Sequence, residues 1–206
     1  MELSRELVAG KLRRWEKYLY NFQLPGWDSI PDFGLYMDQI IGLLTEYLDY
    51  LPPEIKSDRI ITAATINNYV RMKIMPEPKN KKYYRVHIAY LIIICTLKQS
   101  LNIATIQKII PLQLSEADIC RIYTSYAERH RAAADYFIEQ VRIFVQPLLN
   151  NDSGSERVSD ELIFSAAILS GLSRLLAEKI ISLEGLNPKS DGVDLSIPER
   201  KRREEA

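Results

Sequence analysis

The side chains of this chain that could do chemistry gather in one basic segment, from Arg71 to Lys98. The segment holds seven Lys and Arg residues and one acid, Glu77, so its net charge is +6. Three of its lysines stand within the four positions 79–82, after a proline-bounded stretch that cannot be helical. Clustered cations on extended backbone suit contacts with nucleic-acid phosphates. Composition alone favours a simpler interpretation, a solvated charged loop.

A short helix is predicted directly before the lysine cluster, over residues 61–74, with Thr62 as its N-cap. Amide and guanidinium groups of this kind hydrogen-bond to base edges in the major groove of DNA. The predicted helix carries two amides, Asn67 and Asn68, and one guanidinium, Arg71, followed by Lys73. The sequence therefore offers base-reading groups beside phosphate-binding ones.

Other chemistries find little support in the sequence. The two histidines, His87 and His130, and the two cysteines, Cys95 and Cys120, have no metal-ligand spacing, and no nucleophile or phosphate-loop motif is present. We expect that the protein is not an enzyme and that it binds no cofactor or metal ion. Four tyrosines are interpreted as core residues, with a pocket between helices as the alternative: Tyr47, Tyr50, Tyr126 and Tyr136.

The composition is that of a globular chain. Of its 206 residues 47% are hydrophobic, and 27 basic residues balance 27 acidic ones. The zero sum hides a stretch, residues 27–58, with seven acids and one base, a net charge of −6. Two cysteines predict a reducing compartment, and the absence of a signal core or a long apolar run predicts a cytoplasmic protein without a membrane span.

Helical periodicity dominates the sequence, and strand patterns are nearly absent, so we predict an all-α fold. Ser115 is the expected start of a long amphipathic helix that ends near Pro147. The last helix is apolar over more than one stripe, which predicts burial on two sides. The predicted helices cover residues 3–22, 35–51, 61–74, 84–100, 102–110, 115–147 and 160–183.

Residues 60–110 resemble the winged helix-turn-helix of MerR-type regulators. The motif residues are TINNY at 65–69 for the recognition helix, IMP at 74–76 for the turn, and YRVH at 84–87 for the end of the wing. The isoleucine and leucine spacing of the next two helices also fits. Residues 30–135 are similar to an uncharacterised bacterial family of unknown function whose members are presumed to be MerR-like.

The resemblance implies DNA-binding positions on the helix and on or beside the wing. They are Thr65, Asn67, Asn68, Arg71, Lys73, Lys79, Lys81, Lys82, Tyr84 and Arg85. Thr65 and Tyr84 would be the uncharged phosphate contacts. The sequence departs from the pattern, because Asn67 replaces the usual arginine and Lys73 and Tyr83 replace glycines. The tight turn of the wing must therefore be built differently.

The expected organisation is an N-terminal helix (1–26), a MerR-like winged domain (27–112), a C-terminal helical region (113–184) and a flexible tail (185–206). The resemblance implies that the helix over 115–148 could join two protomers as a homodimer. Its 3.6-residue period and the two-sided last helix favour packing of these two helices within one monomer instead. Both arrangements are compatible with the sequence.

The expected function is a sequence-specific transcriptional regulator that binds double-stranded DNA, with an effector ligand that the sequence does not identify. The alternative is a non-enzymatic helical adaptor that retains a degenerate winged fold. The two differ in one respect. An adaptor predicts that the lysines of residues 79–82 pair with the acidic stretch 27–58, whereas a DNA-binding protein leaves them free.

Overall fold

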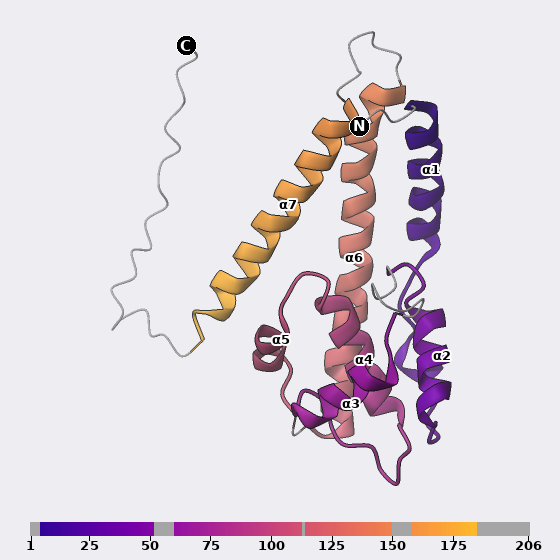
Figure 1. The fold of residues 1–206 in the computed structure, drawn as a ribbon, viewed down its shortest axis with the longest axis vertical. Helices are drawn as coiled ribbons and strands as arrows, with labels where there is room; N and C mark the ends of the chain where they lie inside the picture. Colours follow the sequence, from indigo (N-terminus) through magenta and orange to yellow (C-terminus); the bar gives the residue numbers. More distant parts are fainter. Residues whose placement is uncertain (1–4, 52–59, 113, 150–157, 185–206) are drawn as a thin grey trace.

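The computed structural model describes residues 5–51, 60–112, 114–149 and 158–184, and this part of the chain is all-α with no strand, as expected. A single turn of 3-10 helix covers Trp27–Ser29. The seven α-helices of the described residues are α1 (Arg5–Asn21), α2 (Met37–Tyr47), α3 (Ala63–Arg71), α4 (Arg85–Leu97), α5 (Ile103–Ile109), α6 (Glu116–Leu149) and α7 (Val158–Ile181). In Figure 1, α2 to α5 gather around the lower half of α6.

Polar caps confirm three of the predicted helix starts. The Thr62 hydroxyl accepts the Thr65 N–H at 3.2 Å, and the Asn102 side chain accepts the Thr105 N–H at 2.9 Å. At α6 the Asp118 N–H donates to the Ser115 hydroxyl at 3.2 Å. Each cap satisfies a backbone donor that has no partner inside its helix. The caps are therefore local signals that the sequence displays directly.

Several helix ends differ from the predictions. Helix α3 ends at Arg71 and α4 at Leu97, each three residues before its predicted end. Helix α2 ends at Tyr47, because Leu48 turns out of helical geometry at φ −125°, although Leu48 and Leu51 remain buried. The apolar spacing thus continues past the last helical residue. Helix α6 runs through Pro147 to Leu149, since a proline in the last turn breaks one hydrogen bond without dividing the helix.

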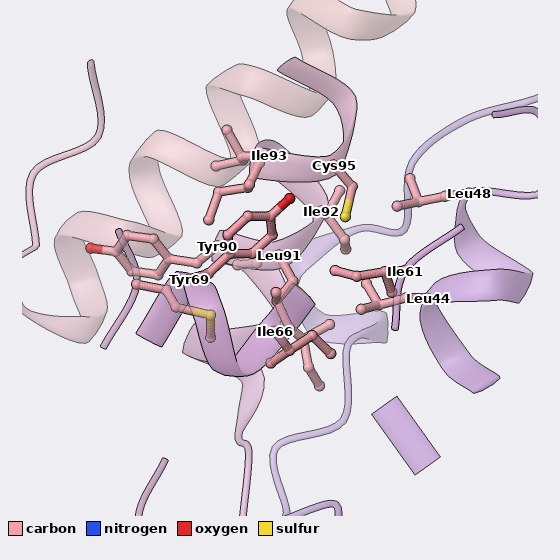
Figure 2. Packing of buried hydrophobic residues seen from close by; sticks show 14 of the residues in the cluster. Leu44, Leu48, Ile61, Ile66, Tyr69, Tyr90, Leu91, Ile92, Ile93 and Cys95 are labelled. Atoms are coloured by element: carbon pink, nitrogen blue, oxygen red, sulfur yellow. The ribbon is translucent and has the colours of Figure 1, made fainter. Parts of the chain in front are cut away.

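Helix α4 is the centre of the hydrophobic core. Every residue from His87 to Cys95 is buried, so no face of this stretch meets solvent. Figure 2 shows α4 residues packed among side chains of α3, of α2 and of the segment before α3. Ile119 and Tyr123 of α6 are fully buried in the same cluster. The core therefore continues past residue 112, where the sequence placed a domain boundary.

Helix α6 packs against α1 along its upper half and against α4 along its lower half (Figure 1). Arg142 of α6 pairs with Glu16 of α1 at 2.7 Å, and the Trp15 and Phe137 rings meet edge to face with centroids 5.4 Å apart. Arg131 donates to the carbonyls of Tyr20, in the last turn of α1, and of Phe22, just after it. The predicted N-terminal helix is therefore bound to α6.

Helix α7 does not lie along α6. It diverges from α6 across the view of Figure 1 and packs against α5. This arrangement differs from the expected pairing of the last two helices within a monomer. It also differs from the expected two-sided burial, because most large apolar side chains of α7 are exposed.

Candidate nucleic-acid interface

The lysine cluster forms a tight two-residue hairpin. Lys79 and Lys82 exchange both backbone N–H···O=C hydrogen bonds at 3.0 Å. Between them Asn80 and Lys81 have φ angles of 51° and 62°, the left-handed pair of a type I′ turn. The hairpin is an isolated bridge, and the described residues contain no wing of strands. The turn that usually needs glycine is thus built by an asparagine and a lysine.

The segment before α2 supports this hairpin from one side. Leu35 and Tyr83 exchange both backbone hydrogen bonds at 2.8 Å. Next to this bridge a Cβ on Gly34 would lie 2.9 Å from Lys82 Cδ and 3.0 Å from Tyr84 Cζ. The Lys82 ammonium lies 5.2 Å from the centre of the Tyr36 ring, a cation–π geometry. Gly34 therefore permits the close approach that orients Lys82.

His87 joins the start of α4 to the segment before the hairpin. Its Nδ1 accepts the Tyr84 N–H at 3.0 Å, so the proton resides on Nε2, which donates to the Glu77 carbonyl at 3.0 Å. Burial, aided by the nearby charge of Lys79, holds the pKa of His87 below its usual value, against the raising effect of the backbone hydrogen bonds. The neutral imidazole thus holds the segment before the hairpin against the start of α4.

Helix α3 displays a hydrogen-bonded set of side chains. Arg71 donates to the Asn68 carbonyl oxygen at 2.7 Å, and the Asn68 amide lies 3.3 Å from the Met72 sulfur. Asn67 is exposed, and no hydrogen bond links its side chain to another described residue. Of the two predicted amides, only Asn67 therefore keeps both its donor and its acceptor available.

The end of α3 places Lys73 in the left-handed region, at φ 53°. The Ile74 N–H reaches back to the Tyr69 carbonyl, and the Lys73 N–H reaches the Val70 carbonyl, both at 3.0 Å. This is the Schellman pattern that usually ends in glycine. Its hydrophobic closure is the buried pair of Tyr69 and Ile74. The lysine at this glycine position is therefore held out to solvent next to Arg71.

Three of the predicted contact residues are used inside the fold. Thr65 is half-buried, with its hydroxyl 2.9 Å from that of Thr62. Tyr84 packs over Gly34. Arg85 donates to the Ile30 carbonyl at 2.8 Å, lies over the Trp27 ring, and is only 18% exposed. Their roles here are structural, and the residues that remain for an external ligand are the exposed ones.

Lys79 and Lys81 are exposed and Lys82 is half-buried, and the described part of the acidic stretch, residues 27–51, does not neutralise them. Within the described ranges Lys79, Lys81 and Lys82 form no ion pair. The basic segment meets the acidic one through Arg85 and Asp28, which are 3.8 Å apart, and Asp28 is almost fully exposed. Figure 1 places α3 and the loop between α3 and α4 together at the lower end of the molecule. We call this surface, defined by Asn67, Arg71, Lys73, Lys79, Lys81 and Lys82, the basic face.

The sequence did not identify several residues that shape the basic face. Gln107 of α5 donates to the Met72 carbonyl at 3.2 Å and so supports the end of α3. Asn80 supplies the first left-handed position of the hairpin, and Tyr36 lies under Lys82. The only available signal was Asn80, because asparagine favours left-handed turns. The other two contacts depend on tertiary packing.

The four tyrosines divide between core and surface. Tyr50 bonds to His130 Nε2 at 2.8 Å, and Tyr126 bonds to Thr96, so both are in the core. Tyr47 lines a surface cavity of about 680 Å³ between α1 and α2, on whose rim Tyr18 bonds to Asp49. Tyr136 is exposed on α6. A shared pocket lined by all four is therefore not formed.

No group of three or more His, Cys, Asp or Glu residues among those that the structure describes could hold a metal ion. None of the helices described combines the length and the apolar character needed to cross a membrane.

The comparisons with known proteins give one match. No curated protein and no solved structure matches the sequence. Residues 25–127 match the model of a domain of unknown function, DUF1836. This range holds α2 to α5, the basic face and the first part of α6, including the buried Ile119 and Tyr123. It covers half of the chain, and the protein therefore belongs to the DUF1836 family.

Proposed function

We propose that the protein is a sequence-specific DNA-binding regulator that contacts DNA through the basic face. The observation that carries the proposal is the cluster of lysines on a fixed hairpin, which no described acid neutralises. Cations that are preorganised beside an exposed helix suit the phosphates flanking a groove. The rival adaptor function predicted the opposite, a hairpin paired with the acidic stretch.

In this proposal the residues of the basic face have different roles in binding DNA. Lys79, Lys81 and Lys82 would bind phosphates, and Arg71 with Lys73 would continue the contact to the end of α3. Asn67 is the candidate base reader, because its amide is exposed and can form the bidentate pair with adenine. Asn68 instead holds the Arg71 guanidinium in place. The proposal therefore assigns affinity mainly to the hairpin and specificity to α3.

The test is DNA binding by fluorescence anisotropy across a range of salt concentrations, on a site selected from a random library. The Lys81→Ala/Lys82→Ala variant should lower the slope of log affinity against log salt by about 0.9 per lysine. The matched control Lys11→Ala/Arg129→Ala removes the same charge from exposed positions of α1 and α6 and should leave the slope unchanged.

Asn67→Ala separates specific from general binding. It should cost about 1–3 kcal/mol on the selected site and almost nothing on random DNA. If the wild-type protein binds no selected sequence better than random DNA at moderate salt, the proposal is wrong. If the hairpin variant and the control weaken binding equally, net charge rather than the basic face is responsible.

A further inference from the structure

Helix α7 presents its apolar side away from the rest of the chain. Eight of its large apolar residues are between 43% and 65% exposed. One is Ile163, and the other seven are Phe164, Ile168, Leu169, Leu172, Leu175, Leu176 and Ile180. At 100° per residue these seven fall within an arc of about 160° on one side of the helix. We call this side the α7 apolar face.

The chain covers part of the opposite side of α7, toward the C-terminal end of the helix. Ala177 packs against the hydrophobic core, and Glu178 and Ile181 are half-buried. This side contains the small residues Ala167 and Gly171. The contact with α5 thus uses the less apolar side of the helix. A helix placed in this way leaves its main hydrophobic surface for another partner.

The order of residues on this face is symmetric about Leu172. Phe164 and Ile180 stand eight positions on either side of it, Ile168 and Leu176 four positions, and Leu169 and Leu175 three positions. Ile163 and Ile181, nine positions away, lie on the opposite side of the helix and are not part of this face. When two such helices lie antiparallel across a two-fold axis at Leu172, every apolar residue shares a level with an apolar residue of the other copy.

The polar residues obey the same symmetry. Lys179 lies within the arc of the apolar face, and its symmetric position is Ser165, a small polar residue. An antiparallel pair thus places the lysine stem beside a hydroxyl instead of a second lysine. In a parallel pair, two Lys179 ammonium groups would meet at the same level, which is unfavourable. The pattern therefore favours the antiparallel arrangement.

The area agrees with a stable dimer. Seven large side chains that expose about half of their surface present on the order of 700 Å² per helix, close to the roughly 800 Å² that each partner of a standard interface buries. The covered sides of α6 are already occupied by α1 and α4. Among the residues whose exposure is described, α6 exposes three large apolar side chains, Tyr136, Phe137 and Ile143, against seven on the α7 apolar face.

We propose that two copies of this chain associate through the α7 apolar face as an antiparallel, two-fold symmetric homodimer centred on Leu172. This inference does not depend on DNA binding. A second copy is the occupant because the seven apolar positions are symmetric about Leu172 and their exposed area is close to what one partner of a standard interface buries. A different protein would have no reason to require the symmetry about Leu172.

The first test measures molar mass by light scattering and sedimentation over a concentration series. The wild-type chain should show twice its 23.8 kDa mass. Leu172→Asp brings two carboxylates together at the axis and should raise the dimer dissociation constant at least about 100-fold. Ser173→Asp adds the same charge beside the face and should have a much smaller effect. Both positions are exposed, so circular dichroism should show an unchanged fold.

The second test determines the direction of pairing by cross-linking of thiols in a Cys120→Ser background. Leu172→Cys should cross-link to itself, and Phe164→Cys should not. A mixture of Phe164→Cys and Ile180→Cys chains should cross-link to each other. A wild-type monomer at tens of micromolar would overturn the proposal, as would a dimer that survives Leu172→Asp. Self-cross-linking of Phe164→Cys would overturn the antiparallel arrangement.

Discussion

Helices α4 and α7 are both rich in isoleucine and leucine, yet their environments are opposite. Nine consecutive residues of α4 are buried, whereas eight large apolar residues of α7 are exposed. Helix α4 is surrounded by α2, α3 and α6, while α7 touches the rest of the chain along one narrow side. Apolar composition therefore indicates that a helix needs burial, and the surrounding chain decides whether one molecule can supply it.

The largest expected effect comes from truncating a leucine in each helix. Leu91→Ala in α4 removes a fully buried side chain and should cost about 2–5 kcal/mol of unfolding free energy. Leu172→Ala in α7 should cost less than about 0.5 kcal/mol in the monomer, because its side chain is exposed. Urea unfolding at low protein concentration measures both. Equal losses would show that the monomer itself covers α7.

Alanine in place of glycine sharpens the same comparison. Gly34→Ala brings a Cβ within 3.0 Å of Lys82 and Tyr84, and this overpacking should cost about 1–3 kcal/mol. Gly171→Ala in α7 meets nothing within 4 Å and should stabilise the helix by about 0.5–1 kcal/mol. Thermal unfolding measures the predicted loss of stability in the first variant and the predicted gain in the second. Gly34→Ala should also weaken DNA binding, and a variant with unchanged affinity would separate the hairpin from that function.

The smallest expected effect is a dependence of stability on pH. Burial lowers the pKa of both His87 and His130 in the folded protein below the ordinary value of 6.5. The unfolded chain therefore binds more protons in this range, so stability is complete above about pH 6.5 and declines as the pH falls toward the lowered values. Denaturant unfolding at a series of pH values measures the decline.

Helix α7 again provides the contrast, because it contains no histidine. The dimer dissociation constant should stay level over the pH range in which the core loses stability. A dimer that dissociates in parallel with the titration of the histidines would show that α7 depends on the core. Stability that stays constant down to about pH 5.5 would contradict the lowered pKa values.

The sequence predicted the features that depend on neighbouring residues. Thr62, Asn102 and Ser115 mark helix starts because each cap acts on the backbone within three residues. Periodicity also predicted the all-α class and the position of α4. The end of α2 was misplaced, because Leu48 and Leu51 are buried in a turn with the spacing of a helix.

The features that the sequence did not predict depend on contacts between distant segments. Arg85 was expected on the binding surface, but it binds the Ile30 carbonyl, 55 residues away. Tyr123 was not singled out, although it is buried and donates to the Pro25 carbonyl at 2.7 Å. The sequence also did not predict that the apolar residues of α7 are exposed. An apolar stripe has the same spacing whether it packs against its own chain or against another chain.

The hydrogen bonds of His87 have a spectroscopic consequence. Because Nδ1 accepts and Nε2 donates, the ring is fixed in one neutral tautomer, and its two nitrogens should give widely separated ¹⁵N resonances. The Nε2 proton should exchange slowly with water for as long as Glu77 accepts it. In ¹⁵N-enriched protein this imidazole therefore reports whether the hairpin keeps its contact with α4 when a ligand binds.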